Sequence, residues 1–138
     1  MNKLLHEAMT RGSPVFSIKD GNFLYMNIDV IAYWNRVIAI AKDLPGAEIS
    51  TSYGTPAFKV NKKLFTRLRE DGRTLVVYSQ DRDVWMKKDP STFFITDHYK
   101  NYPWLLVDLA SVKTGDLKKL LHVAWQLRAP KRLIDSRK

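Results

Sequence analysis

Hydrophobic side chains recur at helical spacing in two segments of the chain and at strand spacing between them. Residues 29–44 and residues 114–127 each place their apolar positions on one face of a helix. Pro45 ends the first pattern and Pro130 follows the second. A helix with one apolar stripe has to cover another element, so both helices are expected to pack on a sheet.

The interval between these helices has the pattern of an antiparallel sheet. A hydroxyl-rich loop at residues 50–56 leads into the first strand, and short polar turns separate the next ones. Five strands are expected, at residues 57–60, 64–69, 73–78, 93–96 and 104–109. A short helix over residues 80–88 is expected to join the third strand to the fourth.

Strict alternation along the second strand assigns its side chains to two faces. Phe65, Arg67 and Arg69 are candidates for the face that the helices leave partly open, together with Lys59 from the first strand, and the alternative for Phe65 is a place in the core. Leu64 is expected on the opposite face, against the helices.

This order of elements predicts a single two-layer α+β domain, with a five-stranded antiparallel sheet and helices packed on one face. The domain is expected over residues 29–133 of the 138, and residues 134–138 as a basic tail. Residues 1–28 are expected to be an N-terminal extension, either a hairpin turning at Asp20-Gly21 or a poorly ordered segment.

Composition narrows the function classes. The chain has no cysteine, which excludes disulfides, thiol nucleophiles and cysteine-ligated zinc. It has no apolar run long enough to cross a bilayer, and its first residues lack a signal-peptide core. We therefore expect a cytoplasmic protein with no membrane association, and a monomer.

The net charge of +9 is concentrated at one end of the chain. Residues 113–138 carry eight Lys and Arg against two Asp, which gives +6. A basic end of this kind favours contact with nucleic acid, an acidic protein or anionic lipid, and the alternative is a solvated tail.

Six short segments in order resemble the MmcQ/YjbR family, and together they cover residues 29–133. They are Leu44-Pro45-Gly46 and the segments at residues 51–58, 64–70, 93–99, 102–104 and 129–132. The resemblance implies a fold like that of the bacterial frataxin homologue, with a five-stranded antiparallel sheet. It also implies a non-enzymatic protein that binds DNA through a double-wing arrangement of hairpins. Lys87-Lys88 departs from the family, whose members often have an acidic helix there.

Basic side chains beside aromatic ones are the candidates for contact with DNA. They are Lys62, Lys63, Arg67, Arg69, Lys118, Lys119, Arg128, Lys131 and Arg132. An alternative for Arg67 is an ion pair with Glu70 or Asp108 across the strands.

A rival interpretation is a protein-interaction or small-ligand module. The loops at residues 50–56 and 97–104 could together form an aromatic cleft. Its expected lining is Tyr53, His98, Tyr99, Tyr102 and Trp104.

Catalytic and metal sites have little support in the sequence. The three histidines are scattered, and although Ser52 or Tyr53 could be assembled with His98, no pattern requires it. The frataxin-like fold suggests iron, but the first helix offers only Asp29 and Asp43 as oxygen ligands. We expect no catalytic residue, no metal and no cofactor.

Overall fold

The computed structural model describes residues 17–19, 22–25 and 28–136. The predicted Asp20-Gly21 turn and the last two residues of the predicted basic tail lie outside the described residues. The sheet strands are β3 (Ala47–Ser52), β4 (Thr55–Val60), β5 (Lys63–Leu68), β6 (Thr74–Tyr78), β7 (Phe93–Phe94) and β8 (Trp104–Asp108). The helices are α2 (Ile28–Ala41), α3 (Arg82–Lys88), the 3-10 turn η1 (Asp97–Tyr99), α4 (Thr114–Arg128) and α5 (Lys131–Ser136). Strands β1 (Ser17–Lys19) and β2 (Asn22–Tyr25) form a separate antiparallel pair.

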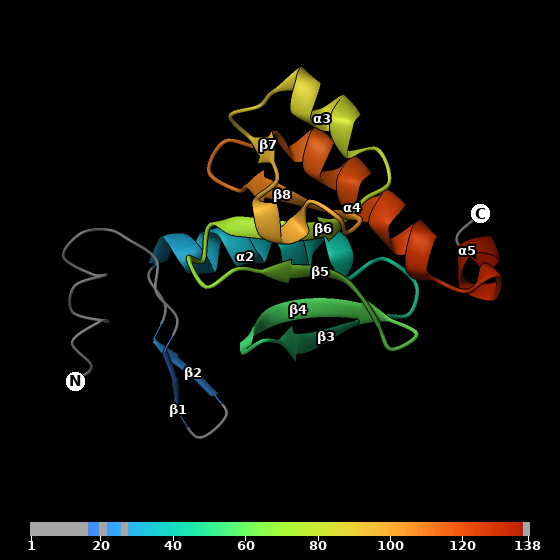
Figure 1. The fold of residues 1–138 in the computed structure, drawn as a ribbon. Helices are drawn as coiled ribbons and strands as arrows, with labels where there is room; N and C mark the ends of the chain where they lie inside the picture. The colour runs from blue at the N-terminus through green and yellow to red at the C-terminus, as the bar shows by residue number, and fades with distance from the viewer. Residues whose placement is uncertain (1–16, 20–21, 26–27, 137–138) are drawn as a thin grey trace.

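The six strands form one antiparallel sheet in the order β3-β4-β5-β6-β8-β7. Helices α2 and α4 bury their apolar stripes against a single face of it, around a core that includes Val37, Phe58, Leu75 and Leu121. In Figure 1, α2 lies behind the strands while the orange η1 turn lies in front of β6. The predicted α+β fold, with an antiparallel sheet and helices packed on it, is confirmed.

A sixth strand, β3, forms where the sequence predicted a loop. Tyr53 (φ 52°) and Gly54 (φ 77°) both adopt left-handed backbone angles. Two consecutive positive φ values are the signature of a type I′ turn, which closes a two-residue hairpin. Ser52 therefore pairs directly with Thr55, and the hydroxyl-rich segment becomes an edge strand instead of a loop.

A bulge in β5 changes the side-chain faces that strict alternation predicted. Phe58 pairs with Thr66, and the next residue, Lys59, pairs with Leu64, so Phe65 is an extra residue on β5. Phe65 turns into the core and is fully buried, so its place on the open face by alternation is wrong and the alternative of a core residue is correct. Leu64 is displaced to the open face, whereas Arg67 lies there as predicted.

The chain continues as helix beyond Pro130. Residues 134–136, predicted as part of a tail, belong to α5. Leu133 of this helix packs on Gly46, where an added Cβ would lie 2.6 Å from the Leu133 Cδ1 atom. This contact fixes α5 against the turn that follows α2.

An ion pair joins Arg73, just before β6, to Asp108 at the end of β8. Arg73 donates from Nε and Nη2 to the two carboxylate oxygens of Asp108, each at 2.8 Å. These bonds are the main cause of the lowered pKa of Asp108. Asp108 is thus the partner of Arg73, and not of Arg67.

Candidate functional site

A cleft of about 560 Å³ lies on the sheet face opposite α2 and α4. The structure brings all five side chains of the predicted aromatic cleft together around it. They are Tyr53, His98, Tyr99, Tyr102 and Trp104. Four further residues complete the lining, namely Leu64 and Arg67 from β5, Glu70 after β5, and Val76 from β6.

The ring side chains differ in depth. Tyr99 is 8% exposed and forms part of the floor, where it packs on Val76. Tyr53 and Tyr102 are 85% and 58% exposed and form the rim. The cleft therefore combines a buried base with ring faces that are open to solvent.

A single arginine on α3 holds the 97–104 segment in place. Arg82 Nη1 donates to the carbonyl oxygens of Tyr99 and Tyr102, both at 2.7 Å, and of Trp104 at 3.2 Å. Its Nη2 donates to the Lys100 carbonyl at 3.0 Å. Carbonyls of a loop that lacks strand partners need donors, and Arg82 provides them from one side chain.

Contacts between aromatic rings hold two of the side chains that line the cleft, Trp104 and Tyr99. Trp104 meets Tyr78 edge-to-face, with ring centroids 5.1 Å apart, and the Arg128 guanidinium lies 4.4 Å from the Tyr78 centroid. His98 meets Tyr99 edge-to-face at 4.7 Å. These geometries are favourable for aromatic and cation–π pairs, so Trp104 and Tyr99 are held by packing.

Arg67 is the charged group at the base of the cleft, and it is only 7% exposed. Its Nη1 donates to the Thr55 hydroxyl at 3.3 Å and to the Leu68 carbonyl at 3.4 Å. Its Nη2 donates to the Tyr99 hydroxyl oxygen at 3.1 Å. The guanidinium carbon also lies 5.1 Å from the centroid of the Tyr53 ring.

Glu70 is the carboxylate that approaches Arg67. Its Oε1 atom lies 3.5 Å from Arg67 Nη1, and its side chain is 64% exposed. A charge-assisted N–H···O bond is normally about 2.7–2.9 Å long, so this pair is loose. The ion pair between Arg67 and Glu70, one of the alternatives predicted from the sequence, is thus present and lies at the mouth of the cleft.

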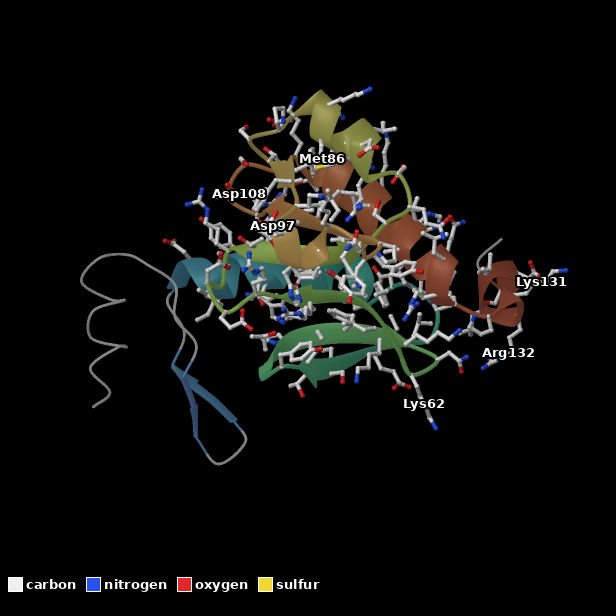
Figure 2. The ribbon with its side chains drawn as sticks, viewed as in Figure 1. Lys62, Met86, Asp97, Asp108, Lys131 and Arg132 are labelled. Carbon is white, nitrogen blue, oxygen red and sulfur yellow. The ribbon has the colours of Figure 1, made fainter. Side chains whose placement is uncertain are left out.

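The other nucleic-acid candidates are not gathered in one place. Arg128 donates from Nε to the Leu64 carbonyl at 3.1 Å, so it is used within the fold. Lys118 and Lys119 are exposed along α4, and Arg69 is half-buried just after β5. The exposed side chains near the Arg128–Leu64 contact are Lys62, Lys63, Lys131 and Arg132. Figure 2 shows Lys62, Lys131 and Arg132 at the same end of the molecule.

Four cleft-forming residues were missing from the predicted cleft. Strict alternation places Leu64 on the wrong face because it does not include the bulge, and the sequence predicts only DNA contact or an ion pair for Arg67. Glu70 and Val76 reach the cleft through the pairing of β5 with β6. Arg82 acts on backbone atoms 17 to 22 residues away, for which no local sequence signal exists.

The geometry of the described residues gives little support for a catalytic site or a metal site. Tyr53 and His98 both line the cleft, but Ser52 does not. Within the described ranges, no three His, Asp or Glu side chains come together in a way that could hold a metal ion. None of the helices in the described part of the chain is long and apolar enough to span a membrane.

A family comparison decides the relationship of this chain to known proteins. The YjbR family model matches residues 42–127, which is more than half of the sequence. The protein belongs to the YjbR family. The predicted MmcQ/YjbR resemblance is thereby confirmed, and every residue that lines the cleft lies within the YjbR match.

Individual relatives support the fold more than the function. Uncharacterized proteins of Mycobacterium tuberculosis and Mycobacterium bovis are 40% identical to this YjbR protein over 48 residues. That alignment covers 35% of this chain and 37% of the relatives, so only a third of their length is matched. A crystal structure of a Deinococcus radiodurans protein with a DUF419 domain superposes with a TM-score of 0.60 at 16% identity. It covers 72% of this chain and 80% of that protein, and it shows the shared fold alone.

Proposed function

We propose that this YjbR-family protein is a binding module that takes a small planar ligand into the aromatic cleft. The observation that carries the proposal is the convergence of three sequence segments on one hollow, with Tyr53, Tyr102 and Trp104 around a buried Arg67. Ligand sites are typically clefts of about 300–1,000 Å³ with mostly apolar walls and few polar groups. The volume of about 560 Å³ falls within that range.

We propose that the cleft binds its ligand without catalysing a reaction. The charged group at the base, Arg67, can hold and orient a ligand but cannot act as a base at neutral pH. Within the residues that the structure describes, no hydrogen bond joins His98 to a nucleophile in the cleft. The aromatic rings of the cleft provide a surface on which a planar ligand can stack, which is a binding role and not a catalytic one.

A thermal-shift screen with aromatic fragments tests this function. We expect a subset of planar fragments to raise the melting temperature, and Tyr102→Ala to weaken their binding by about tenfold, because an aromatic pair contributes about 0.5–1.5 kcal/mol. Tyr102 is 58% exposed, so its truncation should leave the fold intact. Val84→Ala on α3, which removes a 66% exposed side chain outside the cleft, is the matched control. A screen without hits, or equal binding by both variants, would contradict the proposal.

A second candidate function is contact with nucleic acid through a basic end, which we define as Lys62, Lys63, Lys131 and Arg132. Its support is that the Arg128–Leu64 hydrogen bond joins the β4–β5 hairpin to the end of α4, next to α5. Exposed Lys and Arg side chains in such an arrangement provide phosphate contacts that are independent of base sequence.

Salt dependence tests the basic end. Each phosphate contact to duplex DNA contributes about 0.9 to the slope of log K against log salt. The double variant Lys131→Ala/Arg132→Ala is therefore expected to lower that slope by about two in a fluorescence-anisotropy titration. Lys87→Ala, an exposed lysine on α3, serves as the control and should leave the slope unchanged. Absence of binding at low salt, or equal slopes for all three proteins, would rule the basic end out.

A further inference from the structure

We propose that the ligand of the cleft is an aromatic monocarboxylate, whose ring stacks at the rim and whose carboxylate binds Arg67 and Tyr99. This inference rests on the proposed function, because it names the ligand class of the same cleft. It follows from the hydrogen-bonding capacity of Arg67, the hydroxyl of Tyr99 and the position of Glu70.

Arg67 lines the cleft and has donors beyond those that its hydrogen bonds to Thr55, Leu68 and Tyr99 use. A guanidinium carries five N–H hydrogens. Two on Nη1 have acceptors in Thr55 and Leu68, and one on Nη2 has the Tyr99 oxygen. In the part of the chain that the structure describes, the Nε hydrogen and the second Nη2 hydrogen have no acceptor. Nε–H and an Nη2–H lie on one edge of the planar group, which is the edge that binds a carboxylate with two parallel bonds.

Tyr99 extends this donor set. Its hydroxyl oxygen accepts a bond from Arg67 Nη2, which leaves its own hydrogen available for another acceptor. Tyr99 is 8% exposed and lines the cleft, which leaves little water to take that hydrogen. A carboxylate on Arg67 would accept it and satisfy both groups together.

Glu70 is the anion already beside the guanidinium, on its Nη1 side and next to the Nε–Nη2 edge proposed for the ligand. Its carboxylate is a resident anion at the mouth of the cleft, 3.5 Å from Arg67 Nη1 and largely exposed. Exposed ion pairs contribute little to stability, so little is lost when Glu70 swings into solvent. A ligand carboxylate that binds the Nε–Nη2 edge with two parallel bonds, inside the cleft, makes shorter bonds than Glu70 does.

The charges of the lining select the ligand class. Among the described residues that line the cleft, Arg67 and Glu70 carry the formal charges, His98 is taken as neutral, and none is a lysine. One guanidinium balances one carboxylate, whereas a phosphate dianion would leave a negative charge without a partner. A cationic ligand would be repelled by Arg67, which already occupies the cation–π position on Tyr53.

Four probes that share a phenyl ring distinguish the charge types, namely benzoate, benzamide, phenyl phosphate and benzyltrimethylammonium. Isothermal titration of the full chain is expected to give the tightest binding for benzoate, by about tenfold over benzamide. Tighter binding of phenyl phosphate or of the cation would overturn the monocarboxylate. Equal binding of benzoate and benzamide, with loss of both in Tyr102→Ala, would overturn the anion site but leave the proposed function standing.

Two substitutions then test the donor set itself. Glu70→Gln removes the competing anion and is expected to tighten benzoate binding about threefold or more, with little change for benzamide. Glu48→Gln, at an exposed position on β3 outside the cleft, is the matched control. Tyr99→Phe should weaken benzoate more than benzamide, because hydrogen bonds to charged groups are the stronger ones. Weaker benzoate binding by Glu70→Gln, or a Glu48→Gln effect of the same size, would contradict the displacement of Glu70.

Discussion

Replacement of Arg67 with glutamine is expected to weaken benzoate binding by about 10- to 100-fold. Hydrogen bonds to charged groups contribute about 1.5–3 kcal/mol, and each 1.4 kcal/mol is a factor of ten in affinity. The glutamine amide still has donors for Thr55 and Leu68, but it has neither the charge nor the planar fork. Titration calorimetry gives the affinity, and a urea melt of the same variant reports whether the domain remains folded.

Arg69→Gln is the control for that loss. Arg69 lies two residues further along the chain, is half-buried and does not line the cleft. The Arg69→Gln substitution removes one positive charge close to the cleft, as Arg67→Gln does, so a general electrostatic effect on benzoate binding appears in both variants. If the two variants weaken benzoate equally, Arg67 does not bind the carboxylate.

Replacement of Phe65 with alanine is expected to lower the free energy of unfolding by about 3–5 kcal/mol. Phe65 is fully buried, and its ring centroid lies 6.3 Å from that of Phe58. Its truncation leaves a cavity beneath the sheet that neighbouring side chains can fill only in part. Urea denaturation monitored by circular dichroism measures the change.

The neighbouring Leu64 provides the comparison for Phe65. Leu64 is half-buried on the cleft side, so Leu64→Ala should cost clearly less stability. Strict alternation along β5 predicts the reverse order, with Leu64 in the core and Phe65 on the open face. A larger loss for Leu64→Ala than for Phe65→Ala would therefore show that the bulge is absent.

The helices could be predicted because their signal is local and repeated. Val30, Trp34, Val37 and Ala41 are all buried at the spacing that the sequence gives, and Pro45 follows the end of α2 as expected. Periodicity over four turns outweighs an irregularity at any one position.

The strand errors arise because a strand is short and its period is two. One extra residue, Phe65, reverses the faces of the residues on one side of it, and no sequence feature marks the bulge. The β3 edge was missed for a similar reason, since Tyr53-Gly54 is a less usual type I′ turn than Asn-Gly. In both cases the pairing with a neighbouring strand decides the structure.

Half of the cleft could be assembled from the sequence, because aromatic side chains in two loops are visible without a structure. The polar side chains of the cleft could not be placed from the sequence. Arg67 reaches Tyr99, 32 residues away, only because β5, β6 and β8 are adjacent in the sheet. The role of Arg82 likewise depends on the position of the start of α3 beside the 97–104 segment, and no local sequence pattern specifies that position.

Titration of isotope-labelled protein with benzoate, followed by the indole N–H signals of its four tryptophans, tests the central claim most directly. Trp104 lines the cleft, whereas Trp34 and Trp125 lie in the core and Trp85 belongs to α3. We expect a saturable shift of the Trp104 signal, with the signals of the other three tryptophans unchanged. A saturable shift at Trp85 alone, or no shift of Trp104 at saturating benzoate, would contradict a ligand site in the cleft.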